Sequence, residues 1–112
     1  MKFCVKTLRK AEADIRSITK YIYERSPQGA SAWLDAYRKA RSRLETAADT
    51  CALADENEHF EIEVRQALFK TKLGRIYRML FTIVGEEVRI LRIRGPGQAP
   101  VFPEELGSSG DE

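Results

Sequence analysis

Residues 74–97 read GRIYRMLFTIVGEEVRILRIRGPG, and this stretch decides the fold of the chain. It contains two runs rich in β-branched and aromatic residues, 76–84 and 88–94, which the loop 85–87 separates. Two such runs around a short loop that contains glycine are typical of an antiparallel β-hairpin. The sequence therefore predicts a hairpin here, and the other elements are expected to support it.

The alternation of side chains along the two predicted strands separates apolar residues from arginines. One face of the first strand carries Tyr77, Met79, Phe81 and Ile83. We expect Leu91 and Ile93 of the second strand to join this apolar face. The opposite, exposed face of the sheet then gathers three guanidinium groups, those of Arg78, Arg92 and Arg94. Such a cluster attracts an anionic partner, although a solvated charged surface is an equally good interpretation.

The composition is that of a single soluble domain. The chain has 112 residues, of which 43% are hydrophobic and 32% are charged, values ordinary for a globular protein. No run approaches the roughly 18 apolar residues of a membrane span, and the charged first residues lack the apolar centre of a signal peptide. We therefore expect a cytoplasmic protein with no membrane partner. Cys4 and Cys51 have no metal-ligand spacing and are expected to be reduced thiols.

The net charge of +2 conceals a segregated distribution of charge along the chain. The balance is +6 over residues 1–48, −5 over residues 49–61, +5 over residues 62–98 and −4 over residues 99–112. A basic body with acidic segments suggests phosphate-bearing or acidic-protein partners more than a membrane surface.

The N-terminal half predicts a strand followed by two helices. Residues 2–7 alternate as a strand with one buried face does, and residues 8–24 carry apolar side chains at helical spacing. Ser26 and Pro27 then end this helix and begin a second one over residues 27–48, because serine is a good N-cap and proline suits the first helical position. The short connection predicts an antiparallel helical hairpin.

Two aromatic residues are better interpreted as structural than as functional. Trp33 lies on the apolar stripe of the second helix and is expected to anchor the core. His59, the only histidine, lies in the acidic connection 49–63 and is expected to be a surface residue and not a general base.

The remaining segments complete the predicted sheet and end in a tail. Residues 64–70 predict a third strand of the sheet, and residues 71–75 a basic turn into the hairpin. Proline, glycine and serine are frequent after the hairpin, so residues 99–112 are expected to form an acidic, flexible appendage. Val101 and Phe102 are expected to pack back onto the body.

These elements define an α+β fold of two layers, in the order β-α-α-β-β-β. Its domain covers residues 1–98, and residues 99–112 are the tail. The sequence contains no glycine-rich phosphate loop, no HExxH or CxxC motif and no serine elbow. We therefore expect no metal and no cofactor, which leaves the handling of phosphate groups by arginine and lysine.

Four strings together resemble the RelE/ParE superfamily of type II toxin-antitoxin toxins. They are AEADIRSITKYI, SPQGASAWLDAY, VRQALFKTKLGRIYRMLF and VRILRIRGPGQ, and they span about residues 9–98. The resemblance implies a compact α+β toxin that a cognate antitoxin protein neutralises by wrapping it with a helix and an extended segment.

One branch of this superfamily, the RelE-like toxins, cleaves messenger RNA in the ribosomal A site without metal. The resemblance to this branch implies that Arg78 holds the phosphate and that Lys70 and Lys72 complete the catalytic candidates. Further anion-binding residues would then be Arg75, Arg92 and Arg94. These ribonucleases usually place a tyrosine or a histidine-tyrosine pair after the last strand, whereas this chain has GPGQ at residues 95–98. The terminal acid or base of that mechanism is therefore missing from this position.

The other branch, the ParE-like toxins, poisons DNA gyrase and is not enzymatic. The long helical hairpin and the missing terminal histidine or tyrosine fit this branch better, so the sequence favours a gyrase target. A ribosome-dependent ribonuclease is the alternative function, and a binding module without toxicity is a further one.

Overall fold

The computed structural model describes residues 2–106, and within them the predicted α+β order is confirmed. The elements are β1 (Cys4–Thr7), α1 (Arg9–Tyr23), α2 (Pro27–Ala47), β2 (Arg65–Phe69), β3 (Tyr77–Val84) and β4 (Glu87–Arg94). The described chain also contains three short 3-10 helices. They are η1 (Ala48–Thr50) and η2 (Asp55–His59) between α2 and β2, and η3 (Pro103–Leu106) after β4. Each predicted helix and strand is found with ends that differ by no more than two residues from the expected ones.

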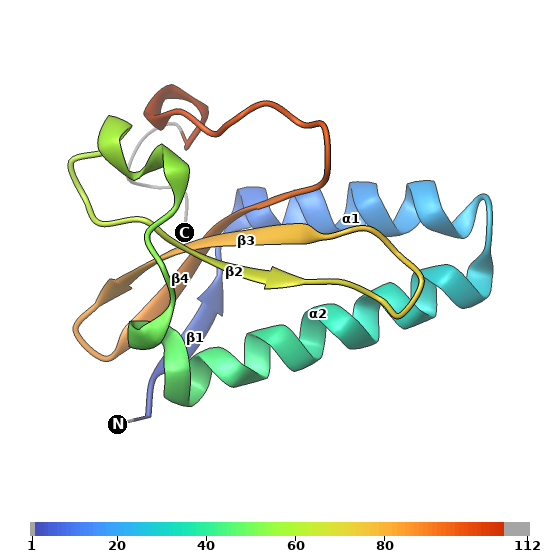
Figure 1. Cartoon of the computed structure of the whole chain (residues 1–112), viewed down its shortest axis with the longest axis horizontal. Helices are drawn as coiled ribbons and strands as arrows, with labels where there is room; N and C mark the ends of the chain where they lie inside the picture. The colour runs from blue at the N-terminus through green and yellow to red at the C-terminus, as the bar shows by residue number, and fades with distance from the viewer. Residues whose placement is uncertain (1, 107–112) are drawn as a thin grey trace.

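The four strands form one sheet in the order β1-β4-β3-β2 (Figure 1). β3 pairs antiparallel with both β2 and β4, as a meander does, whereas β1 pairs parallel with β4. The helical hairpin lies behind the sheet in Figure 1 and connects β1 to the meander. The turn of the β3–β4 hairpin depends on Gly85, whose φ of 63° is a value that glycine adopts without the penalty of a side chain.

The helices and the facing side of the sheet enclose the main hydrophobic core. Trp33 is 2% exposed and confirms the expected anchoring role. Its ring lies 5.9 Å from that of Tyr37, 5.5 Å from that of Phe69 and 5.5 Å from that of Tyr77, measured between centroids. These contacts join α2 to both β2 and β3. Because ring pairs at such distances add to the stabilisation from burial, this cluster fixes the position of α2 on the sheet.

A β-bulge makes the side-chain alternation of β4 differ from the expected one. The pairing runs Leu80 with Arg92 and then Phe81 with Ile90, which leaves Leu91 as an extra residue in β4. A bulge reverses the alternation at this point. Leu91 consequently packs in a second hydrophobic cluster with Leu80, whereas Ile93 packs in the main core. The expectation that Leu91 and Ile93 share a face was therefore wrong.

Other segments of the same chain pack on the face of the sheet that points away from the helices. η2 and η3 lie together at the upper left of Figure 1, on the side where β2 begins. The second cluster there is formed by Ala54, Val64, Leu80, Leu91 and Val101, with Phe60 and Leu106 packed against it. The prediction that Val101 packs back onto the body is confirmed, since it is 1% exposed. Phe102 is 40% exposed, and its ring lies 5.0 Å from that of His59 between centroids.

The outer edge of β1 is closed by α2. The backbone N–H of Phe3 donates to the carbonyl of Glu45 at 2.7 Å, and Arg41 Nη2 donates to the carbonyl of Val5 at 2.8 Å. Unpaired strand edges invite pairing with other chains, so these bonds protect the N-terminal side of the sheet. Among the described residues, no helix is both long and apolar enough to cross a membrane.

Candidate anion-binding site

The three arginines of the expected site lie on one face of the sheet, as the sequence predicted. Arg78 of β3 pairs in register with Arg94 of β4, and Leu80 pairs with Arg92. Cross-strand partners share a face. The arrangement of the guanidinium groups is therefore a property of the meander, but their surroundings differ from the expected ones.

The guanidinium group of Arg78 is held by a carboxylate of the same chain. Its Nη1 donates to Glu56 Oε1 at 2.9 Å and its Nη2 donates to Glu56 Oε2 at 2.7 Å, which makes the pair bidentate. A third bond runs from Nη1 to Gln66 Oε1 at 3.1 Å. Arg78 is thus tied both to η2 and to the neighbouring strand β2.

Glu56 is the most buried charged residue of the described chain, with a side chain only 1% exposed. It also accepts a hydrogen bond from the backbone N–H of Val101 at 3.1 Å. The hydrogen bonds from Arg78, helped by that from Val101, lower the pKa of Glu56 to about 2, against the opposing effect of burial. The same pairing raises the pKa of Arg78. Both groups are therefore charged at neutral pH and neutralise each other.

Arg92 is bound to α1 through Asp14. Its Nε and Nη2 donate to Asp14 Oδ2 and Oδ1 at 2.8 and 3.0 Å. Asp14 Oδ2 also accepts the backbone N–H of Ile93 at 2.9 Å. β1 ends at Thr7 and leaves this part of β4 without a neighbouring strand. Asp14 therefore supplies the acceptor that the missing strand would have supplied.

Arg94 is bound to η3 through Glu105. Arg94 Nη2 forms an ion pair with Glu105 Oε1, and Arg92 Nη1 reaches the same oxygen at 3.4 Å. Arg94 is 9% exposed. The C-terminal acidic segment therefore places a carboxylate against Arg92 and Arg94 of β4.

The expectation that these three arginines form an exposed cluster was wrong. Carboxylates from η2, α1 and η3 already pair with all three. An incoming phosphate would have to displace a buried or half-buried carboxylate, and separating such a pair leaves an uncompensated charge. One signal of this neutralisation lay in the acidic balances of residues 49–61 and 99–112, but these balances do not say which acid meets which arginine.

The other expected site residues do not join the three arginines. Lys70 and Lys72 are exposed and line a cleft of about 350 Å³ between the end of β2 and the outer side of α2. Arg75 is exposed and lines a separate pocket of about 620 Å³, together with Tyr21 and Tyr77. The six candidate residues thus belong to three places on the molecule.

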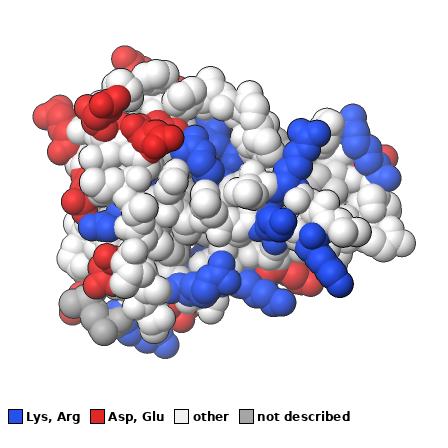
Figure 2. Space-filling model, in the orientation of Figure 1, with Lys and Arg blue, Asp and Glu red and all other residues white. Residues whose placement is uncertain are grey.

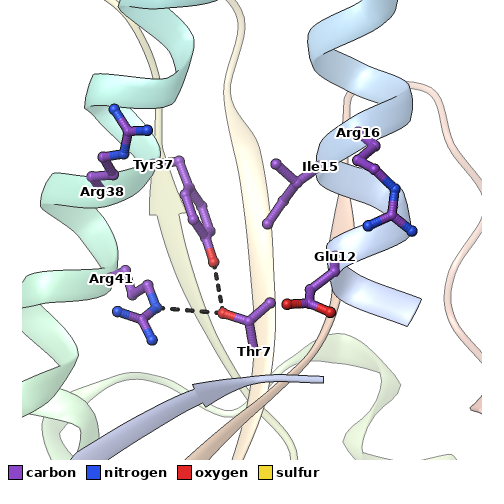
Figure 3. A pocket seen from close by; sticks show the side chains of 7 residues that line it. All are labelled: Thr7, Glu12, Ile15, Arg16, Tyr37, Arg38 and Arg41. Atoms are coloured by element: carbon purple, nitrogen blue, oxygen red, sulfur yellow. Dashed lines mark hydrogen bonds between the residues drawn. The ribbon is translucent and has the colours of Figure 1, made fainter. Parts of the chain in front are cut away.

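Sequence reasoning did not identify a pocket between the two helices, which Figure 3 shows. It measures about 470 Å³ and combines Glu12 and Arg16 of α1 with Arg38 and Arg41 of α2. Its floor carries two hydrogen bonds to Thr7 Oγ1, one shared with the Tyr37 hydroxyl at 3.0 Å and one donated by Arg41 Nε at 3.3 Å. Burial raises the pKa of Tyr37. The Glu12 carboxylate points toward Thr7 at this floor, so the three arginines of the pocket share it with one acidic group.

Charged side chains are separated across the surface in Figure 2. Acidic side chains gather at the upper left, over η2 and η3, whereas lysines and arginines occupy the side of α2 and of the β2–β3 connection. His59 is exposed among the acidic residues, as expected, and its Nε2 lies 3.7 Å from Glu58 Oε1. Cys4 and Cys51 are free thiols, and burial raises the pKa of Cys51. In residues 2–106 no group of three or more histidine, cysteine or acidic side chains could hold a metal ion.

A parallel β1–β4 pair, an antiparallel meander and a helical hairpin on one face define a small α+β domain of two layers. The model of one protein family, ParE toxin of the type II toxin-antitoxin system parDE, matches residues 5–100. Because this match covers most of the sequence, the chain belongs to the ParE toxin family and so to the RelE/ParE superfamily.

Comparison with solved structures supports the same fold. A chain of the chromosomal ParDE toxin-antitoxin system from P. aeruginosa superposes with a TM-score of 0.64 and 23% sequence identity. The match covers 84% of this chain and 96% of that one. No curated protein matches the sequence.

Proposed function

We propose that this chain is a growth-inhibiting toxin that acts on DNA gyrase and that a cognate antitoxin encoded beside it neutralises it. The observation that carries the proposal is the match of the ParE toxin family model over residues 5–100. The toxin binds gyrase and stalls the cleaved-DNA complex, and it performs no chemistry of its own.

The arrangement of the arginines supports a toxin that is not a nuclease. Metal-independent cleavage of RNA needs cations that face the reacting phosphate, with an acid and a base beside them. Here Arg78 is engaged by Glu56, and Arg92 by Asp14. Residues 95–98, which follow β4, contain no side chain that could act as the acid or base.

The lysines do not restore a nuclease site. In a ribosome-dependent ribonuclease we would expect Lys70 and Lys72 to converge with Arg78 on one phosphate. Lys70 and Lys72 line the cleft against α2, whereas Arg78 lies with Leu80 on the face that points away from the helices. We therefore rank the ribonuclease function second.

A single set of expression experiments tests the target. Induction of the chain in bacteria should arrest growth and induce the DNA damage response, while messages bound to ribosomes stay intact. In a purified system the chain should increase gyrase-linked double-strand breaks in plasmid DNA. A Phe81→Ala variant, which opens a cavity at a residue 0% exposed, serves as the misfolded control.

Two results would reject this assignment. Cleavage of messages at ribosomal A sites without gyrase-linked breaks would assign the chain to the ribonuclease branch. Normal growth at verified levels of soluble protein would reject a toxic function and would favour a binding module without toxicity. Neutralisation is tested separately: co-expression of the adjacent small open reading frame should restore growth, and its product should co-purify with this chain.

A further inference from the structure

The cleft between α2 and the end of β2 is lined by several basic side chains. Four cations line it, Lys39 and Arg43 from α2 and Lys70 and Lys72 from the segment after β2. All four are exposed. Within the described part of the chain, none of the four forms an ion pair or a side-chain hydrogen bond that would neutralise it.

Among the described residues that line the cleft, Asp35 carries the one carboxylate. Its Oδ1 is 3.7 Å from Nη1 of Arg38, a cation that does not line the cleft. The four cations therefore outnumber the one described carboxylate, and an anionic ligand would turn the repulsion among them into attraction. This is the situation that the sequence predicted for the sheet face, where the structure places carboxylates instead.

We propose that this cleft binds the phosphate backbone of duplex nucleic acid. Lys39 and Arg43 are four residues apart on one row of α2, about 6 Å along the helix axis, so they can reach different phosphates of one strand. Lys70 and Lys72 stand on the opposite wall. Lysine and arginine on both sides of a concave surface are suited to contacts with phosphate oxygens, which do not depend on base sequence.

The floor of the cleft favours a duplex over a single strand. Proteins that hold single strands stack bases on exposed aromatic rings. Of the described residues that line the cleft, Phe69 is the aromatic one, and it is 6% exposed and packs its ring against Trp33. No ring in the cleft is thus free to stack on a base.

The same floor disfavours an acidic protein as the ligand. Protein interfaces gain most of their affinity from aromatic, arginine or large apolar anchors that fill pockets. Apart from Arg43, the described lining offers no such anchor, because its apolar part consists of Ala32 and Ala36 beside the buried ring of Phe69. Charge without apolar anchors fits a nucleic acid backbone better than a protein surface.

Binding of a labelled 24-base-pair DNA duplex to the full chain, made by cell-free synthesis and followed by fluorescence anisotropy, tests the proposal. If four phosphates are neutralised, the slope of log K against log salt is about −3.6, so that affinity falls about 150-fold between 50 and 200 mM salt. A Lys39→Ala, Lys72→Ala variant, with one change on each wall, should reduce the slope to about −1.8 and weaken binding at 50 mM salt by about tenfold or more.

The matched control removes the same charge elsewhere. Arg9 and Lys20 are exposed on α1 and do not line the cleft. An Arg9→Ala, Lys20→Ala variant should keep both the slope and the affinity within about twofold. Circular dichroism of both variants ensures that only folded protein is compared.

Four outcomes would overturn the proposal. They are the absence of saturable duplex binding at 50 mM salt, equal losses in the cleft variant and the α1 variant, binding of single-stranded DNA as tight as that of the duplex, and displacement of the duplex by polyglutamate at equal charge. The last result would identify an acidic polypeptide as the ligand. Because this assay involves neither gyrase nor growth, its result does not depend on the proposed toxic function.

Discussion

Glu56 and Arg78 form a bidentate ion pair across the outer face of the sheet, with N to O distances of 2.9 and 2.7 Å. The pair links η2, which precedes the meander, to the beginning of β3. Because Glu56 also accepts the N–H of Val101, the pair fastens the C-terminal segment to the same point. Arg78, which the sequence pattern suggested as a ligand-binding residue, therefore stabilises the fold through an internal ion pair.

Acid should destabilise the fold through Glu56. Its pKa is about 2 in the folded protein, against an ordinary value of 4.5. A lowered folded pKa contributes stability that is complete above the unfolded pKa and is lost as the pH falls toward 2. The expected contribution is about 3 kcal/mol. Urea unfolding of the wild type and of Glu56→Gln, measured from pH 6 to pH 2, should give stabilities that converge as the pH falls.

A constant difference between the two proteins over this pH range would contradict the assignment. Glu58→Gln is the matched control, because Glu58 lies two residues away on η2 and its side chain is 79% exposed. Its unfolding free energy should stay within about 0.5 kcal/mol of the wild type at each pH, as for an exposed pair.

Arg78 and Glu56 should show a large coupling free energy. Arg78→Gln alone leaves the buried carboxylate without its countercharge, at an expected cost of about 3 kcal/mol. Combining it with Glu56→Gln removes both charges, so the double variant should be more stable than the sum of the two single changes predicts, by about 2 kcal/mol. Urea denaturation of the four proteins measures the coupling. Additive losses would mean that the two residues contribute independently.

Asp14 should hold the free edge of β4 against α1. Asp14→Ala removes the acceptor of the Ile93 N–H and the carboxylate partner of Arg92, at an expected cost of about 2 kcal/mol. Amide hydrogen exchange followed by NMR should show that the protection of Ile93 falls more than that of Phe81 in the middle of β3.

Asp35→Ala provides the comparison for this experiment. Asp35 is an exposed acid of α2 whose pair with Arg38 has a distance of 3.7 Å. This variant should leave the protection of Ile93 unchanged. Equal loss of protection at Ile93 and Phe81 in Asp14→Ala would show a general destabilisation and not a local release of the strand edge.

Local chemistry explains why much of the fold could be predicted from the sequence. The β-branched runs around Gly85 specify the hairpin without reference to the rest of the chain. Ser26 and Pro27 mark the start of α2 in the same way, and the helical spacing of Trp33 places it in the core. Each of these signals lies within a few neighbouring residues.

The features that were missed depend on residues far apart in the sequence. The extra residue Leu91 in β4 cannot be recognised from the strand alone, since a bulge is defined by the register with β3. Glu56 meets Arg78 from 22 residues away, and Asp14 meets Arg92 from 78 residues away. Composition showed that acids were present, but only the tertiary fold decides which arginines they neutralise. The site was therefore predicted less well than the fold that carries it.

The N-cap of α2 offers a test of the local signals. Ser26 Oγ accepts a hydrogen bond from the backbone N–H of Gly29 at 3.0 Å, and Pro27 occupies the first position of the helix. Ser26→Ala removes the acceptor and should lower the free energy of unfolding by about 1 kcal/mol. Urea denaturation measures this loss, and Ser31→Ala, an exposed change inside the same helix, should leave the value within about 0.5 kcal/mol. Equal effects of the two changes would mean that the cap contributes nothing beyond ordinary helix propensity.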